Sequence, residues 1–235
     1  MIPVLILAGG SGTRLKSEVS DVPKPLASIA GIPFIHYLVE HLLKQGVQDL
    51  HFSLGYKGEA IEQSLNKGFP NHLFNYHYEP EPLGTGGALK FCWNTLKSEN
   101  LMVLNGDSYA PFSIKEFSDY FKNKNLEAAI LLKQIIDCSR FGSVEYDADN
   151  RIVKFKEKQS NTQSGWINAG VYILTKSDFF NRTQHLNSFS LEHSFFESHP
   201  HLYAFPTSGY FIDIGIPADF KRAQHELPLY KPSAI

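Results

Sequence analysis

The chain has 235 residues, of which 43% are hydrophobic and 20% are charged, and its formal net charge is −2. This composition is typical of a globular protein with an apolar core, and the small net charge excludes the basic surface of a nucleic-acid-binding protein. No apolar stretch approaches the ~20 residues of a membrane-spanning helix, so we expect no membrane segment. The two cysteines show no metal-binding or disulfide pattern, and we expect a reduced, cytoplasmic protein.

Strand and helix patterns alternate in the first half of the chain. The apolar run Val4–Leu7 predicts a strand buried on both faces. A glycine-rich turn follows, and then a helix that begins at Pro33, where apolar residues recur with helical spacing until Gly46. Further strands are predicted at 49–54, 75–79 and 101–104, with helices at 59–65 and 86–96. This order predicts a mainly parallel sheet covered by helices on both faces.

The second half of the chain is richer in strands. Strand-like segments lie at 128–133, 143–146, 152–157, 166–174, 202–205 and 210–214, and a last helix at 217–226. Asp147–Asn150 predicts a hairpin turn. No linker or repeat separates the halves, so we expect one α/β domain over residues 1–235. Its sheet is expected to be mixed and mainly parallel, and the β-rich second half is expected to cap a site.

The stretch LAGGSGTRL, residues 7–15, predicts a phosphate-binding loop, because ligands of open α/β sheets bind beyond the carboxyl ends of the strands. It is not a dinucleotide fingerprint, whose third glycine would fall on Leu15. It is not a P-loop either, because leucine rather than glycine precedes the lysine. Arg14 and Lys24 supply two cations suited to a polyphosphate. A plain strand–turn with a solvated arginine is the alternative.

This loop and PKPL at 23–26 resemble the signature of sugar-1-phosphate nucleotidylyltransferases, which make nucleotide-diphosphate sugars. Five more segments match that family in the same order, at 79–87 (EPEPLGTGG), 104–107 (LNGD), 155–158 (FKEK), 168–172 (NAGVY) and 210–217 (YFIDIGIP). The resemblance implies a single-domain, Rossmann-like nucleotidyltransferase fold of the GT-A type. It also implies that a sugar 1-phosphate attacks the α-phosphorus of GTP or another nucleoside triphosphate, with Mg2+ as cofactor.

The resemblance assigns roles to individual residues. For the nucleotide they are Leu7, Ala8, Gly9, Gly10, Gly12, Thr13, Arg14, Lys24, Glu79, Gly84, Thr85 and Asp107. For the sugar phosphate they are Gly106, Gly142, Glu157, Lys158, Asn168 and Gly170. The implied catalytic set is Arg14, Lys24, Asp107, Lys158 and Asp213.

Two aspartates are the metal ligands that the resemblance implies. Asp107 directly follows the predicted strand 101–104, and Asp213 lies in the strand-like segment 211–214. We expect both at one edge of the sheet, where they suit Mg2+, which prefers one or two carboxylates together with phosphate oxygens. A turn-capping role is the alternative for each aspartate alone.

Other motifs also have ordinary structural explanations. FKEK is followed by Gln159, where the family commonly has proline, and it is also typical of a charged strand end. Residues 168–170 are also typical of a bulge in a strand. The ten histidines show no metal-ligand spacing, so we expect no zinc site. A non-catalytic sensor of nucleotide sugars is a further alternative, although such a protein would be expected to lack a metal aspartate or Arg14.

Glu79 is expected to select the nucleobase. Uridylyl- and thymidylyltransferases of the family carry a glutamine at the equivalent position, and its amide matches the donor and acceptor of uracil or thymine. A carboxylate only accepts, and guanine presents two adjacent donors, so the residue favours GTP. Contact with the ribose and a plain surface charge are the alternatives. The sequence leaves open which sugar is used and whether the chain forms a homo-oligomer.

Overall fold

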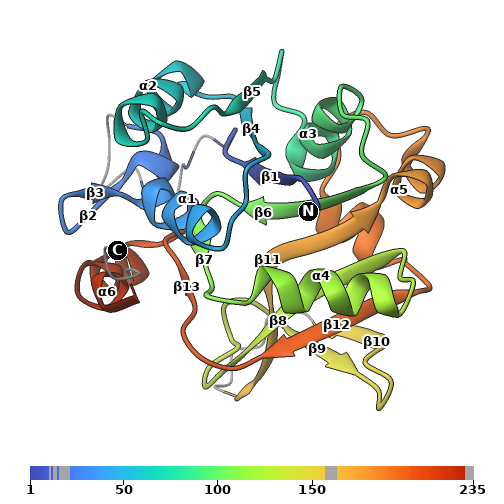
Figure 1. Cartoon of the computed structure of the whole chain (residues 1–235). Helices are drawn as coiled ribbons and strands as arrows, with labels where there is room; N and C mark the ends of the chain where they lie inside the picture. Colours follow the sequence, from blue (N-terminus) through green and yellow to red (C-terminus); the bar gives the residue numbers. More distant parts are fainter. Residues whose placement is uncertain (11, 13–14, 16–21, 157–162, 231–235) are drawn as a thin grey trace.

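The computed structural model describes residues 1–10, 12, 15, 22–156 and 163–230. A seven-stranded sheet with the order β12-β8-β11-β6-β1-β4-β5 forms its centre (Figure 1). The parallel strands on one side are β1 (Val4–Leu7), β4 (Leu50–Leu54), β5 (Asn75–Tyr78) and β6 (Asn100–Asn105). β11 (Gly165–Thr175) is antiparallel to β6 and to β8 (Ala128–Ile135), and β12 (Leu202–Thr207) is parallel to β8. The sheet is therefore mixed and mainly parallel.

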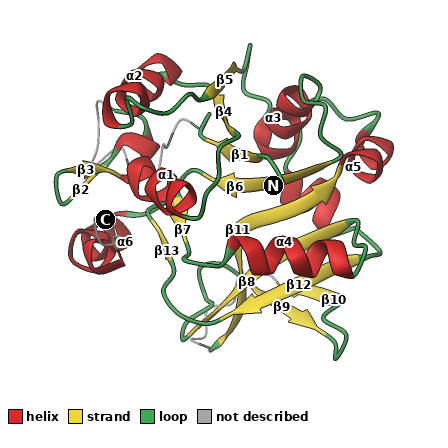
Figure 2. Cartoon of the chain, in the orientation of Figure 1, coloured by secondary structure: helices red, strands yellow, loops and turns green. Residues whose placement is uncertain are grey.

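Helices cover both faces of this sheet (Figure 2). One core cluster contains residues of α1 (Phe34–Lys44), α2 (Gly58–Gly68), α4 (Ile114–Asn123) and α6 (Pro217–Glu226). The other contains residues of α3 (Gly84–Trp93), α5 (Lys176–Thr183) and the π-helical turn η3 (Glu192–Phe196). In β1, Val4 and Ile6 belong to the first cluster and Leu5 to the second. A strand buried on both sides in this way needs a continuous apolar run, as the sequence has.

Two-stranded ribbons adjoin the sheet. β9 (Ser143–Tyr146) pairs with β10 (Ile152–Lys156), β7 (Ser108–Tyr109) with β13 (Ile212–Asp213), and β2 (Ser28–Ile29) with β3 (Ile32–Pro33). The predicted turn at 147–150 joins β9 to β10, and Asn150 donates its backbone N–H to Asp147 O at 3.0 Å. Short 3-10 turns lie at η2 (Lys24–Leu26) and η4 (Leu227–Tyr230).

The main departures from the predicted elements lie in the second half. The helices α4 and α5 are not in the prediction, and the strand predicted at 210–214 shortens to Ile212–Asp213. α4 begins with a local signal, because Ser113 Oγ accepts the backbone N–H of Glu116 at 3.2 Å. Across the residues that the structure describes, no helix has the length and apolar content needed to cross a membrane.

Candidate functional site

A cavity of about 770 Å3 lies at the carboxyl ends of β1, β4, β5 and β6. Each of these parallel strands ends at the same edge of the sheet, so the loops that follow them converge there. The predicted site residues that line the cavity are Leu7, Ala8, Gly9, Gly10, Gly12, Lys24, Glu79, Gly84, Thr85, Gly106, Asp107 and Asp213. Residues predicted for the nucleotide and for the metal therefore share one cavity.

Two carboxylates meet on one wall of this cavity. Lys24 Nζ donates to Asp107 Oδ2 at 2.6 Å. Ser108 Oγ bridges the aspartates, 3.4 Å from Asp107 Oδ1 and 3.1 Å from Asp213 Oδ2. Burial raises the pKa of Asp213, and the neighbouring charge of Asp107 raises it further. Such a pair of close, partly buried carboxylates favours a cation between or beside them.

The route by which Asp213 reaches this wall differs from the prediction. Asp107 does follow a strand of the main sheet, as expected. Asp213 does not share the edge of that sheet, because its strand β13 pairs with β7 in a separate antiparallel ribbon. In this ribbon Asp213 stands opposite Ser108, the residue next to Asp107. The expectation of a shared sheet edge is therefore wrong, and local ribbon pairing brings the carboxylates together instead.

The Glu79 side chain lies on another wall of the cavity. Glu79 follows β5, and its backbone N–H donates to Leu54 O at 2.7 Å. Ser53 Oγ donates to Glu79 Oε1 at 2.9 Å. The carboxylate also packs against Gly9, where any side chain would overlap it. A side chain at residue 9 would therefore displace the Glu79 carboxylate from this position.

The glycine-rich start of α3 packs against the segment before η3. The backbone N–H groups of Gly86 and Gly87 point to Phe189 O, at 2.9 and 3.4 Å. Thr85 Oγ1 donates to Glu192 Oε2 at 2.9 Å and accepts the backbone N–H of Leu191 at 2.8 Å. The Thr85 hydroxyl is therefore engaged inside the protein. The glycines of GTGG let this segment approach the helix.

Most of the described residues that were predicted to bind the sugar phosphate lie outside the cavity lining. Of those described, Gly106 lines the cavity, whereas Gly142, Asn168 and Gly170 do not. Gly142 closes a turn between β8 and β9 by donating its N–H to Cys138 O at 3.1 Å. The register of β11 shifts between Asn168 and Tyr172, which confirms the bulge considered from the sequence. Asn168 Oδ1 accepts the Gly170 N–H at 2.8 Å, and Asn168 Nδ2 donates to Tyr172 OH at 3.0 Å.

The sequence matches a family model described as nucleotidyl transferase over residues 3–228. The chain belongs to this nucleotidyl transferase family. The α/β fold and the type of enzyme that the sequence predicts are thereby confirmed. Among solved structures, it is similar to HddC from Yersinia pseudotuberculosis complexed with GMP-PN. The two chains are 38% identical with a TM-score of 0.87, covering 97% of this chain and 100% of that one.

Two curated relatives of this nucleotidyltransferase differ in the sugar that they are named for. One is a D-glycero-alpha-D-manno-heptose 1-phosphate guanylyltransferase of Aneurinibacillus thermoaerophilus. It is 38% identical over 229 residues, which cover 96% of this chain and 98% of the relative. The other is a mannose-1-phosphate guanyltransferase of Debaryomyces hansenii. It is 34% identical over 227 residues, which cover 92% of this chain and 62% of the relative.

Four predicted site residues of the nucleotidyltransferase lie outside the described residues, namely Thr13, Arg14, Glu157 and Lys158. Their predicted roles stay predictions. The structure adds residues that the sequence analysis did not name, among them Ser53, Ser108 and Glu192. Ser108 follows Asp107 directly, and Ser53 is the fourth residue of β4. The rule that ligands bind beyond the carboxyl ends of the strands, which the sequence analysis applied to the first strand, would therefore have pointed to both serines.

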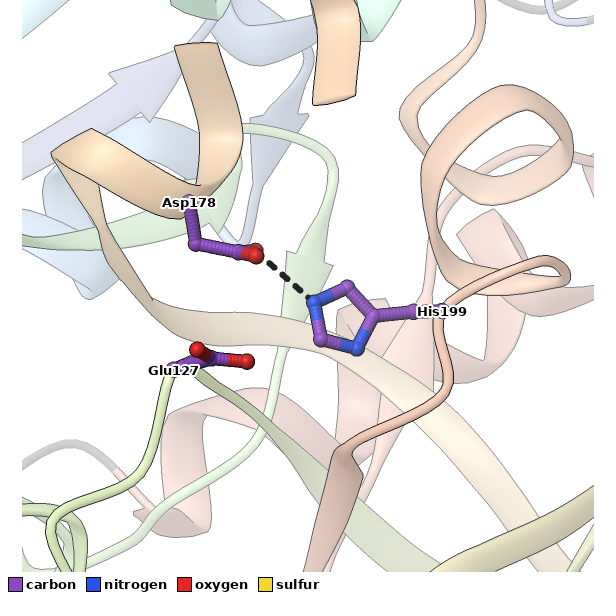
Figure 3. A group of neighbouring side chains, drawn as sticks. All are labelled: Glu127, Asp178 and His199. Carbon is purple, nitrogen blue, oxygen red and sulfur yellow. Dashed lines mark hydrogen bonds and ion pairs between the residues drawn. The ribbon is translucent and has the colours of Figure 1, made fainter. Parts of the chain in front are cut away.

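A second group of titratable side chains lies away from the cavity (Figure 3). His199 Nε2 lies 2.8 Å from Asp178 Oδ2, and its Nδ1 accepts the backbone N–H of His201 at 3.1 Å. Because Nδ1 is an acceptor, Nε2 carries the proton and donates to Asp178. Asp178 also accepts from Arg182 Nε at 2.6 Å. Both ring nitrogens are thus engaged, and with Glu127 nearby the group fastens α5 to the segment after η3.

Proposed function

We propose that this nucleotidyltransferase transfers GMP from GTP to a sugar 1-phosphate, with a GDP-sugar and pyrophosphate as products. The observation that carries the proposal is the single cavity that joins the glycine loop, the Asp107–Asp213 pair and the Glu79 carboxylate. We propose that residues 1–235 act as one domain and that the enzyme is cytoplasmic.

The acidic wall would serve phosphoryl transfer. Asp107 and Asp213 offer the hard oxygen ligands that Mg2+ prefers, and their mutual repulsion favours a bound cation, so these residues fit the metal. A magnesium ion held there would neutralise charge on the phosphates. Lys24 reaches the same wall and would bind the triphosphate together with Arg14. Lys158 would bind the sugar phosphate. In-line displacement at phosphorus needs this alignment and neutralisation more than acid–base chemistry.

Guanine is the base that Glu79 supports best. The Glu79 carboxylate carries only hydrogen-bond acceptors, and guanine offers two adjacent hydrogen-bond donors. Uracil and thymine each pair a donor with acceptors, which an amide would match better. The relatives named above are guanylyl- or guanyltransferases, in agreement with this choice.

For the sugar we propose D-glycero-alpha-D-manno-heptose 1-phosphate. The relative named for that substrate is 38% identical to this chain, and the aligned region covers 98% of the relative. Mannose 1-phosphate is the second candidate, because a relative named for it is 34% identical over 92% of this chain. Glu157, Asn168 and Gly170 would lie near the sugar, the last two through the bulge of β11.

A panel of sugar 1-phosphates, assayed with GTP and Mg2+, tests the proposal. Pyrophosphate release would be measured for the heptose, mannose and glucose 1-phosphates, and the products would be identified by mass. The heptose phosphate should give GDP-heptose with the highest kcat/KM. Preference for mannose 1-phosphate would replace the sugar assignment. Nucleotide binding without turnover on any sugar phosphate would favour a sensor.

A further inference from the structure

Ser53 lies near the carboxyl end of β4, between the glycine loop after β1 and Glu79 after β5. Its side chain is completely buried. The Ser53 carbonyl oxygen accepts the N–H of Ala8 at 2.9 Å, and its Oγ donates to Glu79 Oε1 at 2.9 Å. One residue therefore ties together two walls of the nucleotide cavity.

The Glu79 side chain is held from more than one direction. β4 fixes its backbone, because the Glu79 N–H donates to Leu54 O at 2.7 Å. Ser53 fixes one carboxylate oxygen, and the surface of Gly9 limits the space on another side. Rotation of the carboxylate about its last bond is thus restrained by a hydrogen bond to Oε1. Ser53 does not engage the second oxygen, Oε2.

The direction of the Ser53 hydroxyl is fixed by its neighbours. A carboxylate only accepts, so the hydroxyl proton must point to Glu79. Burial raises the pKa of the Cys92 thiol on α3 to about 12. The thiol therefore stays protonated at neutral pH, and Glu79 Oε1 is the acceptor of the Ser53 hydroxyl proton.

We propose that Ser53 is a positioning residue for nucleotide specificity, whose hydroxyl holds the Glu79 carboxylate in the orientation that accepts both donors of guanine. The proposal rests on the proposed use of GTP. Two adjacent donors need two acceptors in one plane, so a carboxylate free to rotate would lose guanine contacts. Uracil does not present two adjacent donors, so the specificity constant for UTP should fall less than that for GTP when the Ser53 hydroxyl is removed. Ser53 would thus act on the choice of base rather than on the transfer step.

The test compares Ser53→Ala with the matched control Ser118→Ala. Ser118 is a buried serine on α4 whose Oγ has no hydrogen-bond partner among the residues that the structure describes. Specificity constants for GTP and UTP would be measured with saturating sugar 1-phosphate and Mg2+. Because a hydrogen bond to a charged group is involved, Ser53→Ala should lower the GTP/UTP ratio by about tenfold. Ser118→Ala should leave the ratio unchanged.

Two further variants complete the design. Ser53→Cys keeps a similar volume with a weak donor, so it should also lower the ratio, and it serves if the alanine variant does not fold. In a Glu79→Gln background, Ser53→Ala should change the ratio much less than in the native enzyme. An unchanged ratio, or equal losses for GTP and UTP, would overturn the role of Ser53 while leaving GTP use intact. A native preference for UTP would instead overturn the proposed function.

Discussion

Lys24 Nζ contacts Asp107 Oδ2 at 2.6 Å, so a lysine predicted for the triphosphate pairs with an aspartate predicted for the metal. The lysine side chain is largely covered, with 12% exposed, whereas 36% of the aspartate side chain is exposed. Asp213 lies beside it through the Ser108 hydroxyl. Among the described residues, Lys24 therefore places a positive charge beside the two carboxylates. We expect it to move to the phosphates when the nucleotide binds.

Replacing Lys24 with methionine should separate these two roles. Without the lysine, the Asp107 and Asp213 charges repel each other, so the melting temperature in EDTA should fall. Added Mg2+ should then raise the melting temperature more in Lys24→Met than in the native enzyme. The kcat/KM for GTP should drop about ten- to a hundredfold, as expected for a lost charge-assisted phosphate contact. Lys115→Met, which removes an exposed ion pair with Asp119, is the control. Equal Mg2+ responses in native enzyme and Lys24→Met would contradict this role.

The two aspartates should both be needed for turnover. Asp107→Asn and Asp213→Asn keep the shape of the side chain but remove the charge that holds a divalent cation. Each should lower turnover by orders of magnitude while the circular dichroism spectrum stays native. Asp119→Asn, at an exposed position on α4, should be fully active. Turnover that persists in EDTA, or near-normal rates in both variants, would rule out the metal site.

Glu192 should affect the nucleotide loop from a distance. It accepts hydrogen bonds from Thr85 at 2.9 Å and from Ser190 at 2.8 Å, and Tyr172 OH lies 3.4 Å from it. Glu192→Ala leaves these part-buried donors without that acceptor, so it should destabilise the fold by about 1–3 kcal/mol and raise the KM for GTP. Glu197→Ala, at an exposed position just after η3, is the control. Urea unfolding and steady-state kinetics give the two readouts. A native KM in Glu192→Ala would show that the contact is only structural.

The sequence predicts the first half of the fold well, because its signals are local. A buried apolar run, a glycine turn and a helix-spaced apolar face each identify an element without reference to the rest of the chain. The capping pattern at Ser113 and Glu116 is equally local and would have predicted α4. Leu7–Gly10 and Glu79 line the cavity, and their positions there could be predicted because they lie at the ends of parallel strands.

Contacts between distant residues could not be predicted in the same way. Ser108 and Asp213 are 105 residues apart, and Thr85 and Glu192 are 107 apart. No periodicity or spacing links either pair, because tertiary packing alone brings them together. The GTGG motif shows the consequence. The resemblance assigns Gly84 and Thr85 of this motif to the nucleotide, whereas the next two glycines, Gly86 and Gly87, donate their N–H groups to Phe189 O.

Stability should fall in mild acid because five buried or partly buried histidines are harder to protonate in the folded state. Burial is the largest cause that lowers the pKa of His36, His41, His51, His77 and His199. The folded state therefore binds protons at these side chains less readily than the unfolded chain, whose histidines take up protons below about pH 6.5. Their contribution to stability is full above that pH and is lost as the pH falls, by up to ~1.4 kcal/mol per pH unit for each histidine.

Urea unfolding at pH 7.5, 6.5 and 5.5 measures this dependence. His51→Gln should give a shallower fall in stability between pH 6.5 and 5.5 than the native chain. The control is His193→Gln, at a side chain that is 77% exposed, and its profile should match the native one. A flat native profile would contradict the account of the buried histidines.

The base preference in native enzyme and in Glu79→Gln tests the proposed GMP transfer most directly. Specificity constants for GTP, UTP and dTTP would be measured for both proteins with one sugar 1-phosphate. The native enzyme should prefer GTP, because a site built around the half-buried Glu79 acceptor rejects bases that cannot donate to it. Glu79→Gln should lower the specificity constant for GTP by the equivalent of about 1.5–3 kcal/mol. The specificity constants for UTP and dTTP should fall less, so the preference for GTP over them should become smaller. An equal decrease in all three specificity constants would mean that Glu79 does not contact the base. A preference of the native enzyme for UTP would contradict the guanylyltransferase assignment itself.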